Sequence, residues 1–174
     1  MKDFIFKIIL IGDMGVGRTS LMRKYMGGAY YLTYDLRTGI TSPYSKELVV
    51  ANQEVSLRLF DWEGRALPYW VSESYFHNTD GAALIFDLTS MNSLHSLEKW
   101  FQRVNKICGK IPLIIIGNKI DLIGARVIPS GEGEKYARKW GTRYFETSAK
   151  TGENIEKSFI FLIDRMIEAK KYIG

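Results

Sequence analysis

FIFKIILIGDMGVGRT, residues 4–19, joins an apolar run to a glycine-rich turn, and it is the stretch that indicates the fold most clearly. Phe4–Ile11 is nearly all apolar, as expected of a parallel strand that is covered on both of its faces. Apolar residues return at helical spacing from Thr19 to Met26, and Gly27 with Gly28 supplies a stop. The stretch therefore predicts a buried strand, a tight turn and a helix.

The turn resembles a phosphate-binding loop with one exchanged residue. The pattern is G-x-x-x-x-G-K-[ST], and Gly12–Thr19 fits it except that Arg18 stands where the pattern has lysine. Glycines let the backbone N–H groups of such a loop turn toward a polyphosphate, and the following helix N-terminus adds positive potential. The Thr19 hydroxyl could meet a magnesium ion. Taken alone, the motif leaves two interpretations open, a nucleotide site with an altered cation or an ordinary tight turn.

Strand and helix signals alternate along the remainder of the chain. A hairpin is expected from Lys46–Val50 and Val55–Phe60 across the turn Ala51–Glu54, with Asp61 just past its end. Residues 29–45 show no clear period and are expected to form a long loop. Further strands are expected at 82–86, 112–116 and 144–145, and helices at 93–107, 131–140 and 154 to about 171. This order predicts an α/β fold with a mostly parallel sheet, helices on both faces and ligands at the carboxyl ends of the strands.

Length and composition indicate one globular domain. The chain has 174 residues, 46% of them hydrophobic, and its net charge of +5 is spread without an arginine-rich block, so no nucleic-acid partner is expected. The single Cys108 excludes an internal disulfide and is typical of a reducing compartment, which favours a cytoplasmic location. The first apolar run is too short for a signal peptide or a membrane span. The last residues, EAKKYIG, carry no cysteine for prenylation, so we expect membrane contact to be indirect if it occurs at all.

A second candidate element is Asp61-Trp62-Glu63-Gly64. An aspartate after a strand can hold magnesium through water, and the N–H of Gly64 can reach a terminal phosphate. In isolation D-x-x-G is a weak pattern, and it more often marks a plain turn. Its spacing from the glycine-rich turn gives it more weight.

The third and fourth candidate elements are stronger evidence for a nucleotide site than the first two, because they occur together and each supports the other. NKID, residues 118–121, follows an apolar strand, and ETSAK, residues 146–150, follows the last one. The Asp121 carboxylate can accept from both the ring N–H and the exocyclic amine of guanine, whereas adenine would leave it a buried acceptor without a donor. Asn118 can bond the N7 side of a purine, and the stem of Lys119 can cover the ring face. A guanine site is favoured over a capped polar turn.

In this order and spacing, GDMGVGRT, DWEG, NKID and ETSAK resemble the Ras-superfamily small GTPases. The segments YFHNTDGAALIFDLTS and YFETSAKTGENIEKSF are most similar to the Rab branch. The resemblance covers about residues 4–168 and implies a P-loop NTPase G domain, a single domain over residues 1–174. It also implies a six-stranded sheet with one antiparallel strand, GTP or GDP with Mg²⁺, two mobile switch loops, and a role in signalling and vesicle trafficking. Its implied partners are effector, exchange and GTPase-activating proteins, which the sequence does not name.

The resemblance assigns roles residue by residue. Asn118, Lys119 and Asp121 would hold the base, and the backbone N–H of Ala149 would read the guanine oxygen, with Ser148 and Lys150 beside it. Tyr30 would stack on the base, although the loop after Thr19 is one residue longer than usual and leaves Tyr31 as the alternative. The metal would be held by Thr19, Thr38 and Asp61. The phosphates would be bound by Gly64 and by the loop Gly12, Asp13, Met14, Gly15, Val16, Gly17, Arg18, Thr19 and Ser20.

Departures from the family pattern concern phosphate binding and hydrolysis. Arg18 keeps the charge of the usual lysine but not its compact shape. Met14 stands where the family has a small residue, which is expected to crowd the γ-phosphate or block an incoming arginine. Trp62 and Glu63 replace Thr-Ala, and Arg65 replaces the glutamine that positions the attacking water. Because arginine has only donors, it cannot accept a hydrogen bond from that water.

The motifs and their departures bear on three candidate functions. The sequence favours a guanine-nucleotide switch of the Ras/Rab type, a GTP hydrolase of slow intrinsic activity in which Arg65 and Gly64 lie at the reacting phosphate. The alternative is a pseudo-GTPase, an interaction scaffold that keeps the fold but has lost hydrolysis or nucleotide binding. An ATP-using P-loop enzyme is disfavoured by Asp121. His77 and His95 have no partners at metal-binding spacing, so no metal besides magnesium is expected.

Overall fold

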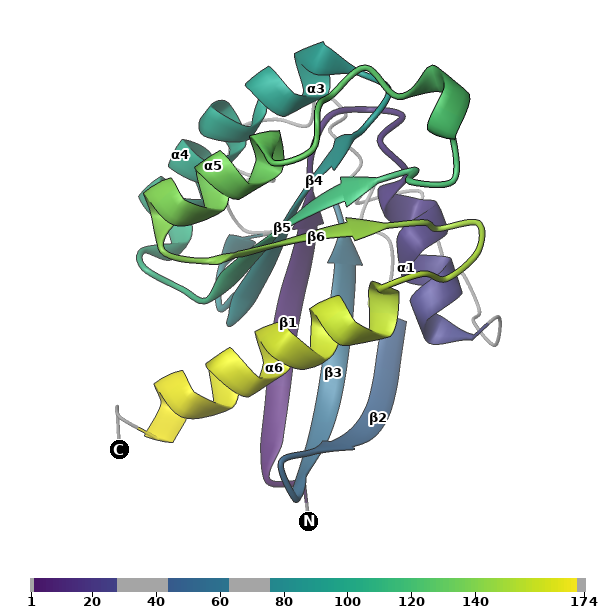
Figure 1. Ribbon diagram of the computed structural model, residues 1–174. Coiled ribbons are helices and arrows are strands. Elements are labelled where there is room, and N and C mark those ends of the chain that lie inside the picture. Colours follow the sequence, from purple (N-terminus) through teal and green to yellow (C-terminus); the bar gives the residue numbers. More distant parts are fainter. Residues whose placement is uncertain (1, 28–43, 63–75, 172–174) are drawn as a thin grey trace, which may run out of the picture.

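The computed structural model describes residues 2–27, 44–62 and 76–171. Its centre is a six-stranded sheet in the order β2-β3-β1-β4-β5-β6 (Figure 1). The strands are β1 Phe4–Ile11, β2 Tyr44–Val50, β3 Gln53–Asp61, β4 Gly81–Asp87, β5 Leu113–Asn118 and β6 Arg143–Thr147. β2 is antiparallel to β3, and every other neighbouring pair is parallel. The predicted α/β fold class is confirmed, including its one antiparallel strand.

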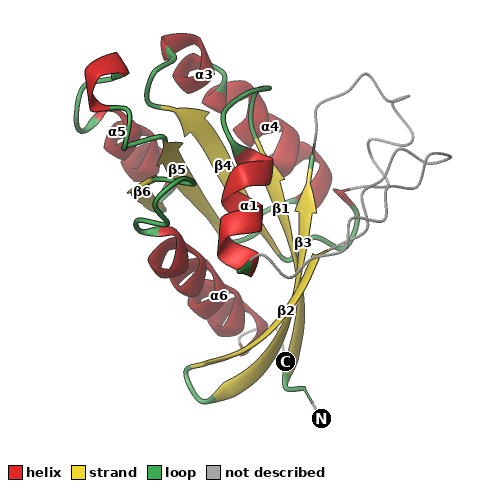
Figure 2. Cartoon of the chain, turned by 90° about the vertical axis from the view of Figure 1, so that its right-hand side faces the viewer, coloured by secondary structure: helices red, strands yellow, loops and turns green. Residues whose placement is uncertain are grey.

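Helices cover both faces of this sheet (Figures 1 and 2). They are α1 Arg18–Met26, α3 Met91–His95, α4 Leu97–Cys108, α5 Glu132–Trp140 and α6 Ile155–Lys171, with a short 3₁₀ helix at Ile123–Ala125. Successive residues of β1 alternate between two cores. Ile8 packs with the apolar sides of α1 and α6, whereas Ile9 packs with those of α3, α4 and α5. This two-sided burial explains why the first strand is apolar at nearly every position.

Several expected boundaries are corrected. Ala51 and Asn52 both have positive φ, 49° and 62°, so they make a two-residue turn, and Gln53 and Glu54 belong to β3. Tyr44 and Ser45 pair with β3 instead of ending the expected loop. The helix expected at 93–107 begins at Met91, where Ser90 caps it, and is divided at Ser96 into α3 and α4. The expectation for the glycine-rich turn, a strand, a loop and a helix in succession, agrees with the structure.

The register of the strands brings polar side chains to one edge of the sheet. Asp61 is the last residue of β3 and pairs with Leu10, so the prediction that it lies just past the strand is wrong. Asp87 pairs with Asn118, and Asn118 pairs with Thr147. The sequence predicts Asn118 and Thr147 beyond shorter strands, but they are the last residues of β5 and β6. Because these ladders extend to the polar residues, backbone hydrogen bonds fix their positions at the carboxyl edge.

Candidate functional site

The glycine-rich loop leaves β1 at this edge and enters α1. Gly15 and Gly17 have φ of 82° and 93°, a region that residues with a Cβ rarely adopt. A Cβ on Gly12 would lie 2.1 Å from the carbonyl oxygen of Ile85, so the start of the loop rests directly on β4. Glycine is thus required where the loop crosses the sheet and where it turns into the helix.

Arg18, the residue that departs from the phosphate-loop pattern, is buried and faces the protein. Its Nε donates to Asp61 Oδ1 at 3.0 Å, and the two side chains are 7% and 2% exposed. Its Nη1 donates to the carbonyl oxygen of Asp13 at 2.8 Å and to that of Gly12. The guanidinium therefore holds the loop backbone and the end of β3 together.

Two of the three predicted metal ligands meet beside Arg18. The Thr19 hydroxyl donates to Asp61 Oδ2, while Arg18 occupies Oδ1. Both oxygens of this carboxylate thus accept hydrogen bonds from the phosphate loop and the first turn of α1. The third predicted ligand, Thr38, lies outside the described residues.

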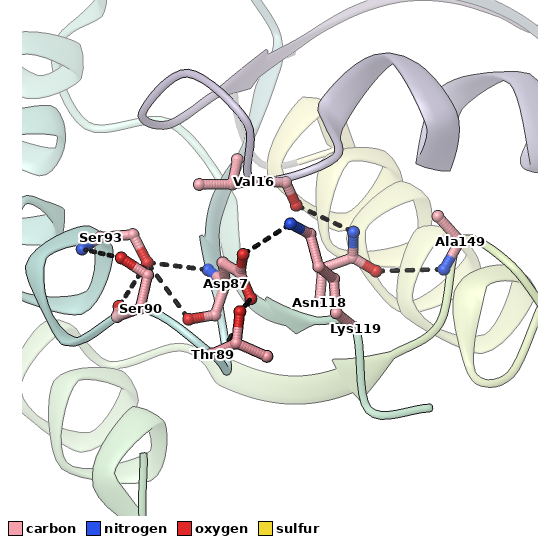
Figure 3. A network of polar contacts seen from close by, with 8 residues as sticks. All are labelled: Val16, Asp87, Thr89, Ser90, Ser93, Asn118, Lys119 and Ala149. Atoms are coloured by element: carbon pink, nitrogen blue, oxygen red, sulfur yellow. Dashed lines mark hydrogen bonds and ion pairs between the residues drawn. The ribbon is translucent and has the colours of Figure 1, made fainter. Parts of the chain in front are cut away.

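Asn118 connects the loop to the proposed base site (Figure 3). Its Nδ2 donates to the carbonyl oxygen of Val16 at 2.9 Å. Its Oδ1 accepts from the backbone N–H of Ala149 at 3.1 Å and from the Thr147 hydroxyl at 3.2 Å. The side chain is 1% exposed, and a Cβ on Gly17 would come within 2.4 Å of its amide nitrogen. One buried amide at the end of β5 therefore joins the loop after β1 to the end of β6 and the segment that follows it.

Lys119 extends across the same region and ends on Asp87, the last residue of β4 (Figure 3). The Lys119 Nζ lies 2.6 Å from Asp87 Oδ2, and its backbone has a positive φ of 73°. Burial opposes the charge on Asp87, but hydrogen bonds from Lys119 and Thr89 outweigh it, so the pKa of Asp87 lies below its ordinary value. The ion pair ties the residue that follows β5 to the end of β4.

Asp121 is oriented by the loop after β6. The hydroxyl of Ser148 donates to Asp121 Oδ1 at 2.6 Å. The same hydroxyl accepts from the backbone N–H groups of Lys150 and Thr151, at 3.2 and 3.0 Å. A carboxylate oxygen carries two lone pairs, so this bond leaves acceptor capacity on both oxygens of Asp121. Ser148 and Lys150 thus shape the site by positioning the aspartate.

Two sets of side-chain contacts that stabilise the site could not be predicted from the sequence. Arg126 binds both oxygens of Glu146 at 2.8 and 2.6 Å, and the Tyr144 hydroxyl donates to the same carboxylate at 2.9 Å. On the opposite side, the indole N–H of Trp100 donates to Asp13 Oδ1 at 2.8 Å. Arg126 is 20 positions from Glu146 and Trp100 is 87 positions from Asp13, so no local period signals these contacts. Glu146 lies in the ETSAK motif, which is the one sequence signal for its contacts with Arg126 and Tyr144, but the motif does not indicate these partners.

The remaining candidate residues divide into exposed, buried and undescribed ones. Met14 is 90% exposed, and Ser20 is exposed on α1. Trp62 is 4% exposed, 5.3 Å from the Phe76 ring and covered by the Arg103 guanidinium, so it packs in the core. Outside the described residues lie Tyr30, Tyr31, Thr38, Glu63, Gly64 and Arg65.

Fold and site together define the class, which is a P-loop NTPase G domain. Residues 7–168 match the sequence model of the Ras family. The Ras-related protein Rab-10 of Diplobatis ommata is 30% identical over 167 residues, which cover 95% of this chain and 83% of that protein. Rab-21 of Homo sapiens is 33% identical over 168 residues, 96% of this chain and 74% of that protein. Rab-1D of Dictyostelium discoideum is 30% identical over 159 residues, 91% of this chain and 78% of that protein.

The chain therefore belongs to the Ras family of small GTPases, and its relatives are of the Rab type. The resemblance read from the four motifs is confirmed at this level. Within the described ranges, no helix is both long and apolar enough to cross a membrane.

Proposed function

We propose that the chain is a molecular switch that binds GTP and GDP with magnesium and hydrolyses GTP slowly. The carrying observation is the position of Asn118, whose amide joins the phosphate loop to the segments that hold Asp121 and Ala149. The proposed phosphate site and purine site would thereby be held at a fixed spacing. Residues 1–174 would form the single G domain of this switch.

Guanine specificity follows from the acceptors and donors at the base site. Asp121 would accept the ring N–H and the exocyclic amine of guanine, while Ser148 holds its carboxylate in place. The Ala149 N–H donates to Asn118 Oδ1, and in the proposed complex it would also donate to the guanine oxygen. Lys119, held by Asp87, would cover the ring, with Tyr30 as the proposed aromatic partner. Adenine would leave a buried acceptor without a donor, which costs about 1–3 kcal/mol.

The chemistry of Thr19 and Asp61 suits magnesium, because both offer the hard oxygen atoms that this ion prefers. Thr19 uses its hydroxyl hydrogen on Asp61 and keeps its lone pairs for a metal. Thr38 would supply a further oxygen. Bound magnesium would neutralise charge on the phosphates, which the loop N–H groups and Arg18 also counter.

Slow hydrolysis is inferred from the residue types at Arg65 and Met14. Gly64 and Arg65 would lie at the reacting phosphate, where the family pattern has a glutamine that orients water. Arginine supplies donors and no acceptor, so this orientation is lost. The 90% exposure of Met14 agrees with a side chain that stands above the loop, where it would meet an arginine supplied by an activating protein.

Effector, exchange and activating proteins would be the macromolecular partners of such a switch. No specific observation favours the alternative of a pseudo-GTPase scaffold. A cytoplasmic location stays a prediction from the sequence. The proposal is best separated from the scaffold alternative by the nucleotide content of the protein.

The experiment is denaturation of purified protein followed by chromatography of the released nucleotides. We expect GDP or GTP in near-stoichiometric amount and little adenine nucleotide. Asp121→Ala, purified identically, should release less guanine nucleotide, and Asp164→Ala in α6 serves as the matched carboxylate control. A protein that carries no nucleotide and binds none on titration would support the scaffold instead.

A further inference from the structure

The carboxylate of Asp61 is already compensated by a fixed charge from the protein. Arg18 Nε lies 3.0 Å from its Oδ1, and both side chains are almost fully buried. Charges that are shielded from water interact more strongly than exposed ones at the same distance. An added cation at Asp61 therefore meets a pair with little net charge, and it gains less than it would from a bare carboxylate.

Arginine can do this while it also holds the phosphate loop, because it has five N–H groups. The bonds to Asp61, Gly12 and Asp13 use the Nε hydrogen and Nη1. Among the described residues, Nη2 forms no bond and remains as a donor for a phosphate oxygen. A lysine has three donors on one atom and cannot serve two loop carbonyls, the carboxylate and a phosphate together.

We propose that Arg18 supplies part of the charge that magnesium would supply, so that guanine nucleotide binds here with a weaker dependence on magnesium than it would with lysine at this position. The inference rests on the proposed function and concerns the same site. Its basis is the buried pair of Arg18 with Asp61, together with the hydrogen bond from Thr19 that engages the second carboxylate oxygen.

Because magnesium and nucleotide binding are thermodynamically linked, the proposal can be tested by measuring the affinity of either one. If magnesium changes nucleotide affinity by some factor, nucleotide changes magnesium affinity by the same factor. The coupling between the two should be small in the parent protein. This coupling should be larger in a variant whose residue 18 neutralises Asp61 less completely than Arg18 does.

The experiment titrates a fluorescent GDP analogue into the parent and into Arg18→Lys, once with saturating magnesium and once with excess EDTA. The measured quantity is the ratio of the Kd in EDTA to the Kd in magnesium. We expect this ratio to be at least about tenfold larger in Arg18→Lys than in the parent. The gain in magnesium affinity on loading with GDP, measured by titrating magnesium into the nucleotide-free and the GDP-loaded form of each protein, should be larger in Arg18→Lys than in the parent by the same factor.

Two further variants test whether the effect belongs to the pair of Arg18 and Asp61. Arg23→Lys makes the same exchange on an exposed position of α1 and should keep the parent ratio. Asp61→Asn removes the carboxylate charge at similar size. It should lower the ratio strongly in the Arg18→Lys background and by less than about threefold in the parent. Circular dichroism melting curves establish that each variant is folded.

The outcomes separate the two claims. If the parent binds the analogue and its ratio equals that of Arg18→Lys, the inference about Arg18 is wrong while the proposed function stands. If a folded parent binds no guanine nucleotide in either buffer, the proposed function fails, and the inference fails with it.

Discussion

Asp121 is the residue on which guanine selectivity should depend. We predict that GDP and GTP bind at least about tenfold more tightly than ADP and ATP, and that Asp121→Ala removes most of this preference. The reason is the loss of the paired acceptor that Ser148 holds in position. Calorimetric titration of the four nucleotides measures it, with Asp164→Ala as control. Equal affinity of the parent for GTP and ATP would refute the assignment.

Arg65 should limit the chemical step. Single-turnover hydrolysis in the parent is expected to be no faster than about 10⁻⁴ per second, the intrinsic level of Ras. Arg65→Gln should raise the rate, because glutamine can accept from the attacking water, and Arg65→Ala should leave it nearly unchanged. A large drop for Arg65→Ala, with GTP affinity intact, would instead show that Arg65 acts as an arginine finger within the chain.

For single residues, the sequence predicted which residue types form the site better than it predicted their contacts. NKID and ETSAK indicated a base site, and Asn118, Asp121 and Ala149 do lie together. The direction of Arg18 could not be predicted, because it depends on Asp61, which is 43 positions away. Trp62 belongs to a motif in the sequence, yet the apolar space beside Phe76 accommodates it.

At the scale of elements, the ion pair of Arg126 with Glu146 ties the segment after β5 to the end of β6. Hydrogen bonds from Arg126 lower the pKa of Glu146 below its ordinary value, although burial opposes them. The stability that this carboxylate contributes is present above the ordinary glutamate pKa of about 4.3 and is lost as the pH falls through the lowered value.

Glu146→Gln should therefore lower the Tm at neutral pH, and the difference from the parent should shrink as the solution is acidified. A charged hydrogen bond contributes about 1.5–3 kcal/mol, and in a domain of this size the Tm falls by at least about 3 °C. Thermal unfolding followed by circular dichroism over a pH series gives the result. Glu98→Gln breaks an exposed pair with Lys139 and should change the Tm little. Parallel pH curves for Glu146→Gln and the parent would contradict the prediction.

Element order was predictable because each period is local, whereas element ends were not. The hairpin turn is shorter than expected, since Ala51 and Asn52 adopt positive φ without glycine. Polar residues such as Asp61 and Asn118 stayed outside the expected strands because their side chains suggested loops. The parallel ladder includes them nevertheless, since strand ends follow backbone pairing and not side-chain polarity.

At the scale of the whole molecule, the phosphate loop and the sheet are one packed unit. We predict that Gly12→Ala destabilises the protein by about 1–3 kcal/mol, because its Cβ would lie 2.1 Å from the backbone oxygen of Ile85. Gly124→Ala is the control, since a Cβ there meets nothing within 4 Å and should change stability by at most about 0.5 kcal/mol. Urea unfolding of both variants compares them. Equal stabilities would show that the loop can move off β4 at no cost.

The antiparallel pairing of β2 with β3 has a consequence for how the chain folds. Its two strands are joined by a two-residue turn, so they can meet within microseconds, with little loop entropy lost. The contacts of β1 close far longer loops, such as the bond between the Lys7 N–H and Asp80, 73 positions apart. The hairpin can therefore form early and offer β3 as an edge. β1 precedes both of its partners in the chain, so during synthesis it can pair first with β3, which ends at Asp61, and only later with β4, which ends at Asp87.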